Sequence, residues 1–408
     1  MATSTDWAVG IQGTVTQQTD AQSSDVFQGF GASLLAPSAL RPSHHLSLPR
    51  ELATGRQQVR EQIPVCPGIY GWLNRDKTLI YVGKSKSLRH RLLSYFATET
   101  TDPKMAKIRR HSRTLVWEPI SHELLALIRE QELITRFRPS YNVQGKPERR
   151  QPGFICLSQG VAPTIFFARE VPKRAAHAFG PIAGRARLTE VIECLNYVFQ
   201  LRNCPDRVKM QFNNQLELFP DERTAQCLRF ELNTCPGPCA GRCSREAYRQ
   251  KVEKAVRFLR GKDNSMLDRL DERMRQAAAQ LSFERAGVLR DQARQIKWLS
   301  RRIQQMSRAT KKLDGVWSLP GFDHQEHWMI LRAGQIVECT QGRSDARSLP
   351  ACLDAQARQA QVPQTHLNIN LMMLLAAWIK KNPRETKAIV KFKEIVGSTA
   401  SRASQRSA

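Results

Sequence analysis

The feature that most restricts the fold of this chain is a pair of short apolar runs separated by a polar tetrapeptide. The runs cover residues 69–73 and 79–82, and the intervening Asn74-Arg75-Asp76-Lys77 has the composition of a tight turn. This pattern predicts a β-hairpin. We expect the hairpin to belong to a compact α/β unit that extends from Cys66 to Val143.

Two helices and a third strand are expected to complete this unit. Residues 87–95 place apolar side chains at helical spacing with basic residues between them, and residues 115–120 suit a strand. Residues 121–137 also have helical periodicity. Ser121 can cap the first turn of that helix, and Pro139 can stop it.

The whole chain divides by composition and pattern into five expected segments. They are a mostly disordered tail rich in Ser, Thr, Gln and Ala (1–62), the compact α/β unit (63–148), a mixed α/β and cysteine-rich region (149–262), an α-helical hairpin (263–306), and a short β-hairpin, helix and tail (307–408). The helical hairpin is expected to break near Ser282, and the short β-hairpin to turn at Ala333-Gly334.

The charge balance predicts a polyanionic partner. The chain has 63 Lys and Arg against 37 Asp and Glu, a formal charge of +26. Nucleic acid is the partner that this excess suits best, because cations that neutralise phosphates release counterions. Acidic proteins and membrane surfaces are the alternatives. The longest apolar run, residues 371–379, is too short to span a bilayer, and the N-terminus lacks the features of a signal peptide. We therefore expect a cytosolic protein with reduced thiols and no membrane partner.

The α/β unit carries an ordered set of motif residues. Gly68-Ile69-Tyr70 and Tyr81-Val82-Gly83 fall on the two expected strands, and the residues that follow in order are Lys84, Arg91, Tyr95, Glu130 and Asn142. In amino-acid sequence, residues 80–96 and 130–142 resemble the GIY-YIG nuclease domain of the UvrC excinuclease family. The resemblance implies an α/β GIY-YIG nuclease domain, a small antiparallel sheet with flanking helices.

The residue types suit the hydrolysis of a phosphodiester. Glu130 would hold Mg²⁺ or Mn²⁺, and the forked donors of Arg91 suit the non-bridging phosphate oxygens. Tyr81 would need a nearby cation to act as a general base, because an unperturbed tyrosine has a pKa near ~10; Lys84 could supply that field. The resemblance implies that Tyr70 and Tyr95 line the site and that Asn142 fixes its geometry. Taken one at a time, the tyrosines could be ordinary strand residues, the basic residues a solvated face, and Asn142 a turn former. The order and spacing of the whole set favour catalysis.

A cluster of cysteines follows in the middle region. Cys204, Cys227, Cys235 and Cys239 are closely spaced, and Cys243 is an additional thiol. In a reducing compartment such a set suggests tetrahedral zinc or an iron–sulfur cluster. The segment is similar to the cysteine-rich region of UvrC, which implies a four-iron, four-sulfur cluster on the first four cysteines. Zinc, or buried thiols without metal, remain alternatives because spacing does not separate them.

The expected helical hairpin has a candidate docking surface. Residues 281–286 and 289–292 resemble the UVR motif through which UvrC and UvrB associate. The resemblance implies a UvrB-like helicase subunit as partner, and we expect Leu281, Phe283 and Leu289 to contact it. The alternative is an amphipathic hairpin packed in a core.

The resemblance covers residues 64–345. UvrC-type proteins continue with a ribonuclease H-type nuclease and helix-hairpin-helix modules, and fewer than 65 residues remain here. We expect one active site that makes one cut in damaged double-stranded DNA, 3′ of the lesion. The first alternative is a non-catalytic DNA-binding or regulatory relative. The second is a GIY-YIG nuclease of mobile elements or recombination.

Overall fold

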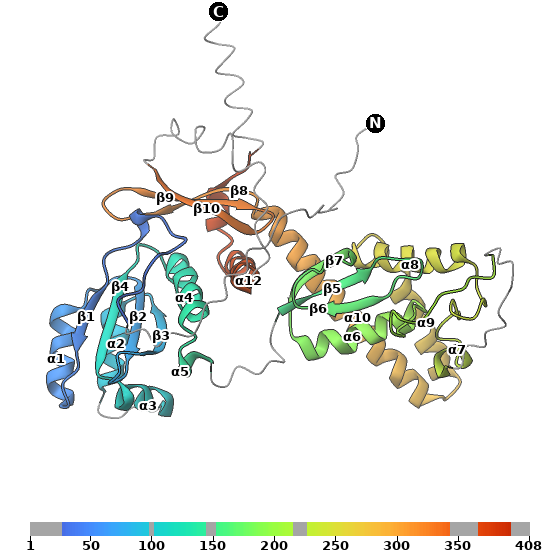
Figure 1. The fold of residues 1–408 in the computed structure, drawn as a ribbon, viewed down its shortest axis with the longest axis horizontal. Helices are drawn as coiled ribbons and strands as arrows, with labels where there is room; N and C mark the ends of the chain where they lie inside the picture. Colours follow the sequence, from blue (N-terminus) through green and yellow to red (C-terminus); the bar gives the residue numbers. More distant parts are fainter. Residues whose placement is uncertain (1–26, 98–101, 144–151, 215–226, 343–365, 393–408) are drawn as a thin grey trace, which may run out of the picture. The chain divides into compact units, whose positions relative to one another are not determined.

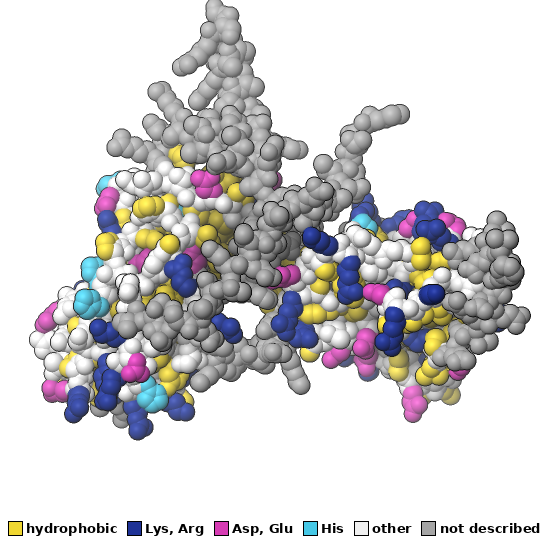
Figure 2. All heavy atoms as spheres, viewed as in Figure 1, with side chains coloured by type: hydrophobic (Ala, Val, Ile, Leu, Met, Phe, Trp, Pro, Cys, Tyr) yellow, Lys and Arg dark blue, Asp and Glu magenta, His cyan; other side chains and the backbone are white. Residues whose placement is uncertain are grey.

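The computed structural model describes residues 27–97, 102–143, 152–214, 227–342 and 366–392. These residues form two compact units, which are drawn in Figure 1. One unit comprises the described residues between 147 and 308, and the other comprises those between 17 and 146 together with those from 309 onward. Each unit is considered by itself. Figure 2 shows Lys and Arg side chains distributed over the visible surface of both units.

The motif residues belong to the second unit, in a four-stranded antiparallel sheet. Its spatial order is β1-β4-β2-β3, with β1 at His44–Ser47, β2 at Gly68–Leu73, β3 at Leu79–Ser85 and β4 at Thr114–Pro119. The predicted turn between β2 and β3 is confirmed. The backbone N–H of Lys77 donates to the carbonyl of Asn74 at 3.2 Å, and Lys77 adopts a φ of 56°.

The helices of this part lie around the sheet (Figure 1). They are α1 (Leu52–Gln62), α2 (Leu88–Leu93), the 3₁₀ turn η2 (Ser94–Phe96), α3 (Pro103–His111), α4 (Glu123–Phe137) and α5 (Ser140–Val143). The helix expected over residues 121–137 is α4. Its N-cap is His122 and not Ser121: the His122 ring nitrogen Nδ1 accepts the N–H of Leu124 at 3.2 Å. The helix ends at Arg138, which adopts a left-handed conformation.

The prediction of a disordered tail is wrong for residues 27–62. This segment contains the 3₁₀ turn η1 (Pro37–Ala39), strand β1 and helix α1. Although nearly half of its residues are polar, its apolar side chains Phe30, Leu35 and Val59 are buried. Burial of these few side chains, together with the pairing of β1 with β4, orders a segment whose composition alone suggests disorder. Residues 1–26 lie outside the described part of the chain.

A second antiparallel sheet belongs to the same unit. Its order is β10-β9-β8-β11, with β8 at Gly315–Pro320, β9 at Glu326–Arg332, β10 at Gln335–Gly342 and β11 at Ile389–Val390. The predicted hairpin between β9 and β10 is confirmed, because Ala333 and Gly334 both have positive φ. Helix α12 (His366–Lys381) contacts both β10 and α4, and the 3₁₀ turn η4 (Glu385–Ala388) follows it.

The first unit combines a three-stranded sheet with helices. The sheet order is β6-β5-β7, with β5 at Pro152–Ser158, β6 at Ile165–Ala168 and β7 at Ala175–Ala183. The helices are α6 (Arg185–Val198), which contacts β5 and β6, α7 (Leu228–Glu231), α8 (Arg245–Leu259), α9 (Ser265–Ala279) and α10 (Phe283–Lys312). The predicted break near Ser282 is confirmed between α9 and α10. In the part of the chain that the structure describes, no helix is long and apolar enough to cross a membrane.

Candidate active site

Three tyrosines and an arginine meet beside strands β2 and β3 of the first sheet. Tyr70 comes from β2, Tyr81 from β3 and Tyr95 from η2. The hydroxyl oxygens of Tyr70 and Tyr95 are 3.2 Å apart, and the ring centroids of Tyr70 and Tyr81 are 6.1 Å apart. The Nε–H of Arg91 donates to the Tyr70 hydroxyl at 3.1 Å. The structure therefore brings together four of the residues that the sequence selects, separated by up to 25 positions.

Gly83 makes this arrangement possible. It lies directly opposite Tyr70 in the β2–β3 register. A β carbon at position 83 would be 2.7 Å from the Tyr70 hydroxyl oxygen, closer than a real Cβ contact allows. The glycine of the second strand motif thus leaves the space that the Tyr70 phenol fills.

Burial keeps the Tyr81 phenol protonated. It raises the pKa of Tyr81 above its ordinary value, and the nearby Tyr70 and the negative charge of Glu130 raise it further. A hydrogen bond with Tyr95 and the charge of Arg91 act in the opposite direction but are outweighed. Glu130, on α4, therefore lies near enough to Tyr81 to act on it electrostatically. At neutral pH, Tyr81 is a hydrogen-bond donor that must lose its own proton before it can accept another.

Lys84 faces a different partner from the one expected. Its Nζ lies 2.8 Å from Oε1 of Glu123, in the first turn of α4, and Lys86 contacts the other oxygen of the same carboxylate at 2.9 Å. The cation over the Tyr81 ring is Lys104, whose Nζ is 5.2 Å from the ring centroid. Little in the sequence indicates that Lys104 would contact Tyr81. Lys104 is one of several basic residues on the short helix α3, whose first turn is capped by Asp102.

Asn142 ties α5 to the strand that carries Tyr81. Its Oδ1 accepts the N–H of Val82 at 2.7 Å, and its Nδ2 donates to the carbonyl of Val82 at 2.8 Å. The backbone N–H and the backbone carbonyl of Val82 are thereby both hydrogen-bonded to one side chain. Asn142 thus holds the β3 backbone next to Tyr81.

The donor set around Glu130 suits a cation that keeps most of its waters. Among the described residues, no three His, Cys, Asp or Glu side chains are grouped closely enough to hold a metal ion. Magnesium is commonly held in proteins through one or two carboxylates, with waters and substrate phosphate completing its shell. A single carboxylate at Glu130 beside Tyr81 fits such an ion and does not fit a cage of several protein ligands.

Buried charges on α4 form a network that the sequence analysis did not identify. Arg129 contacts Glu118 on β4 at 3.4 Å and Glu132 on α4 at 2.9 Å. All three side chains are buried. Burial raises the pKa of Glu118 to about 7, against the opposing effect of Arg129. Glu132 is two residues from Glu130, but it belongs to this interior network.

The four predicted cluster cysteines, Cys204, Cys227, Cys235 and Cys239, interact electrostatically but do not form a close metal site. Burial is the largest cause of the raised pKa of Cys235 and Cys239, and the neighbouring thiols of Cys204 and Cys227 raise it further. All described cysteines are free thiols. The donor set of four neighbouring thiols suits zinc or an iron–sulfur cluster chemically. Its arrangement does not, since no three metal-ligating side chains are grouped among the described residues.

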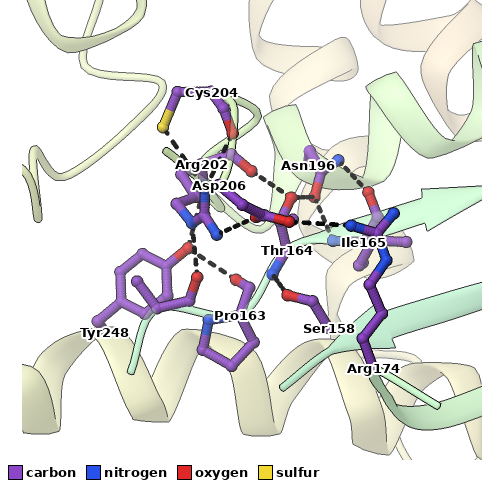
Figure 3. Close-up of polar contacts among 11 residues, drawn as sticks. Ser158, Pro163, Thr164, Ile165, Arg174, Asn196, Arg202, Cys204, Asp206 and Tyr248 are labelled. Atoms are coloured by element: carbon purple, nitrogen blue, oxygen red, sulfur yellow. Dashed lines mark hydrogen bonds and ion pairs between the residues drawn. The ribbon is translucent and has the colours of Figure 1, made fainter. Parts of the chain in front are cut away.

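A polar network anchors the loop that carries Cys204 (Figure 3). Arg202 donates to the Cys204 carbonyl at 2.9 Å and to Asp206 at 2.8 Å, and its Nη1 lies 3.8 Å from the Cys204 sulfur. The backbone N–H of Arg202 donates to the Tyr248 hydroxyl at 3.0 Å. Cys204 is thereby fixed to the interior of the unit, whereas Cys227 is exposed.

The α9–α10 turn exposes two of the three predicted docking residues. Leu281 is 74% and Phe283 68% exposed. Leu289 differs, because it is partly buried and packs against the core of the unit. The two helices are joined by their buried faces and by an ion pair of 2.7 Å between Lys297 and Asp271.

Comparison with protein families matches three consecutive segments. Residues 66–143 match the model of the UvrC-like GIY-YIG domain, residues 154–258 that of the UvrC/Cho excinuclease middle domain, and residues 264–297 that of the UvrB/uvrC motif.

Curated relatives are similar over more than half of the chain. The UvrABC system protein C of Pseudomonas syringae pv. tomato is 34% identical over 238 residues, which cover 58% of this chain and 37% of the relative. That of Methanothermobacter thermautotrophicus is 32% identical over 237 residues, covering 58% and 38%. The chain thus spans less than half the length of these relatives.

Among solved structures, the GIY-YIG N-terminal endonuclease domain of UvrC from Thermotoga maritima, bound to magnesium, is 30% identical. The match covers 23% of this chain and 99% of that domain, with a TM-score of 0.21. Variants of the same domain with one tyrosine changed to phenylalanine match similarly, each bound to its catalytic divalent cation.

Proposed function

Because this chain belongs to the UvrC family, and carries the GIY-YIG domain, the middle domain and the UVR motif in order, we propose that it is a metal-dependent DNA endonuclease of nucleotide excision repair. It makes one incision in damaged double-stranded DNA, on the 3′ side of the lesion, and acts in the cytoplasm. The observation that carries this proposal is the meeting of Tyr70, Tyr81, Tyr95 and Arg91 next to Glu130.

The chain's own residues divide the work of hydrolysis. Glu130 would hold a magnesium or manganese ion, which supplies positive charge to the phosphate and the leaving oxygen when bound. Arg91, whose Nε–H donates to the Tyr70 hydroxyl, would donate from its other N–H groups to a non-bridging phosphate oxygen. Tyr81 keeps its proton at the hydroxyl and orients the attacking water by hydrogen bonding. It becomes a base only if the bound cation and Arg91 together overcome the effects of burial, Tyr70 and Glu130, which all raise its pKa.

The other segments suit recruitment of the nuclease to damage. The exposed pair Leu281 and Phe283 presents an apolar surface at a helical turn, which fits a UvrB-like helicase subunit as partner. The net charge of +26 fits a DNA substrate. The four neighbouring thiols of Cys204, Cys227, Cys235 and Cys239 are the donor set that we propose for a four-iron, four-sulfur cluster, with zinc as the alternative.

Incision of an end-labelled duplex with one bulky adduct tests the proposal. The reaction contains Mg²⁺ or Mn²⁺ and a UvrB-type partner, and compares wild type with Glu130→Ala and with Glu61→Ala, an exposed carboxylate on α1. A single nick 3′ of the adduct, lost only in Glu130→Ala, is expected. Stable DNA and partner binding by wild type without any nick would instead indicate a DNA-binding relative that is not a nuclease.

A further inference from the structure

Helix α4 presents two different faces to its surroundings. Arg129, Glu132 and Arg136 follow one another at intervals of three and four residues, so they share one face of the helix. Glu130 is one residue from Arg129, which places it about 100° around the helix axis from that face. The first face contacts a short stretch of the N-terminal segment, residues 30–34, and the second face is near Tyr81.

Two guanidinium groups hold the backbone of residues 30–32. Arg136 donates to the carbonyl of Phe30 at 2.7 Å and to that of Ala32 at 2.8 Å. Arg129 donates to the carbonyl of Gly31 at 2.7 Å and to that of Ala32 at 2.8 Å. Gly31 has a φ of +68°, and a β carbon there would lie 2.9 Å from Nη1 of Arg136. The chain can bend closely around both guanidinium groups because this residue is a glycine.

Glu132 accepts hydrogen bonds from the same stretch. Its carboxylate accepts the hydroxyl of Ser33 at 2.8 Å and the backbone N–H of Leu34 at 2.6 Å. Arg129 is 1% and Glu132 5% exposed. These bonds join residues almost a hundred positions apart, in an interior where the loss of one partner leaves a charge unsatisfied.

We infer that residues 30–34 form a clasp that fixes the rotation of α4 about its axis, and thereby sets where the Glu130 carboxylate lies relative to Tyr81. Ser33, Arg129, Glu132 and Arg136 are then positioning residues for the metal-binding carboxylate. The inference rests on the proposed function of Glu130 as the metal ligand.

The geometry of a helix makes such a clasp effective. A helix with its side chains is about 10–12 Å across, so a rotation of roughly 20° moves a side-chain tip by about 2 Å. A displacement of about 1 Å at a catalytic group can reduce the rate by on the order of 10²-fold. The N-terminal end of α4 is held separately: the His122 ring lies 6.0 Å from that of Trp378 on α12. The clasp would therefore control the middle of the helix, where Glu130 lies.

A purely structural network is the competing explanation, and metal binding separates the two. The double variant Ser33→Ala/Arg136→Gln weakens the clasp and leaves Arg129 and Glu132 in place. The matched control Ser43→Ala/Arg60→Gln changes two exposed side chains of the same N-terminal segment. Manganese binding to each full-length protein is measured by electron paramagnetic resonance, and folding by circular dichroism and thermal denaturation.

We expect the dissociation constant for Mn²⁺ to rise by about tenfold or more in the clasp variant and to stay unchanged in the control. In a Glu130→Gln background, the clasp substitutions should change the residual Mn²⁺ binding no further. Equal Mn²⁺ affinity in wild type, clasp variant and control would overturn the inference, and so would an undiminished clasp effect in the Glu130→Gln background.

Two further comparisons keep the inference testable if the double variant does not fold. Ser33→Ala alone should weaken Mn²⁺ binding, whereas Ser33→Thr, which retains the hydroxyl, should not; an equal effect of both would overturn the clasp. Wild type that binds Mn²⁺ and incises DNA, with no effect of the clasp variants, refutes the clasp alone. Wild type that neither binds Mn²⁺ nor incises DNA refutes the proposed function together with it.

Discussion

Gly83 and Tyr70 are cross-strand partners, and the phenol of Tyr70 occupies the space that a side chain at position 83 would need. The Tyr70 hydroxyl is at the same time bonded to Tyr95 and Arg91. Tyr70 is 1% exposed, so its ring has little room to move. The conformation of the tyrosine cluster therefore depends on the absence of a side chain from β3.

The substitution Gly83→Ala should consequently impair incision. The added methyl group must displace the Tyr70 ring and so break its bonds to Tyr95 and Arg91, at a cost of about 1–3 kcal/mol in the free energy of unfolding. We expect incision to fall by about tenfold or more. Gly287→Ala on α10, where a β carbon meets open space, is the control; it should leave incision unchanged and raise stability by about 0.5–1 kcal/mol, because alanine favours a helix more than glycine does. Full incision by Gly83→Ala would show that the Tyr70 position is not critical.

The buried carboxyl of Glu118 should make stability depend on pH. Burial raises the pKa of Glu118 in the folded protein to about 7, above its ordinary value of 4.5. The folded state therefore binds the proton more tightly than the unfolded state, so the contribution of Glu118 to stability is full below pH 4.5 and is lost as the pH rises through 7.

Glu118→Gln removes this titration and keeps the shape of the side chain. The free energies of unfolding of the variant and of wild type are measured by urea denaturation. Relative to wild type, the variant should be more stable at pH 8 than it is at pH 5. Other ionisable groups cancel in that difference when the two proteins are compared at each pH. The same difference at pH 5 and pH 8 would mean that Glu118 stays ionised throughout, paired with Arg129.

Local pattern was sufficient for some parts of this molecule and insufficient for others. The β2–β3 turn and the break at Ser282 depend on neighbouring residues, so they could be read from the sequence. The order of residues 30–34 depends on Arg129 and Arg136, about a hundred positions away. No local pattern reveals such contacts, and a segment with few apolar side chains at regular spacing then has the same appearance as a disordered one.

Partners of charged side chains were equally hard to foresee. Lys84 is three residues from Tyr81 in the sequence, but its Nζ pairs with Glu123, 39 positions away. Lys104, which lies over the Tyr81 ring, is 23 positions from it and belongs to another element. Long, flexible cations can reach several anions, so spacing restricts their partners much less than it restricts strand residues.

Exposed apolar residues at the α9–α10 turn should contribute to partner binding and not to stability. Leu281→Ala/Phe283→Ala removes side chains that are mostly exposed, so the thermal denaturation midpoint should change little. Binding to a UvrB-type partner, measured by surface plasmon resonance, should weaken by about tenfold or more. Val288→Ala, an exposed apolar residue one turn further along α10, is the control. Unchanged partner binding by the double variant would place the docking surface elsewhere.

Leu289 should behave differently from the other two predicted docking residues. Its side chain packs against the core of the first unit, so Leu289→Ala should lower the free energy of unfolding. Any loss of partner binding should then accompany a loss of folded protein, detected by circular dichroism at the temperature of the binding assay. Weaker binding with unchanged stability would return Leu289 to the docking surface.

The metal and sulfide content of the purified protein should identify the group that the four cysteines bind. Burial, and then the neighbouring thiols Cys204 and Cys227, raise the pKa of Cys235 and Cys239, so in the metal-free protein these two thiols are protonated at neutral pH and should react slowly with alkylating reagents. Binding of a metal or cluster must deprotonate them. Protein purified without oxygen should contain iron together with acid-labile sulfide.

The iron and sulfide should be lost in Cys235→Ser and retained in Cys66→Ser, a half-buried thiol of the second unit. Zinc without sulfide in wild type, lost in the same variant, would establish the alternative metal. Neither metal in wild type would mean that the four thiols are structural or redox groups.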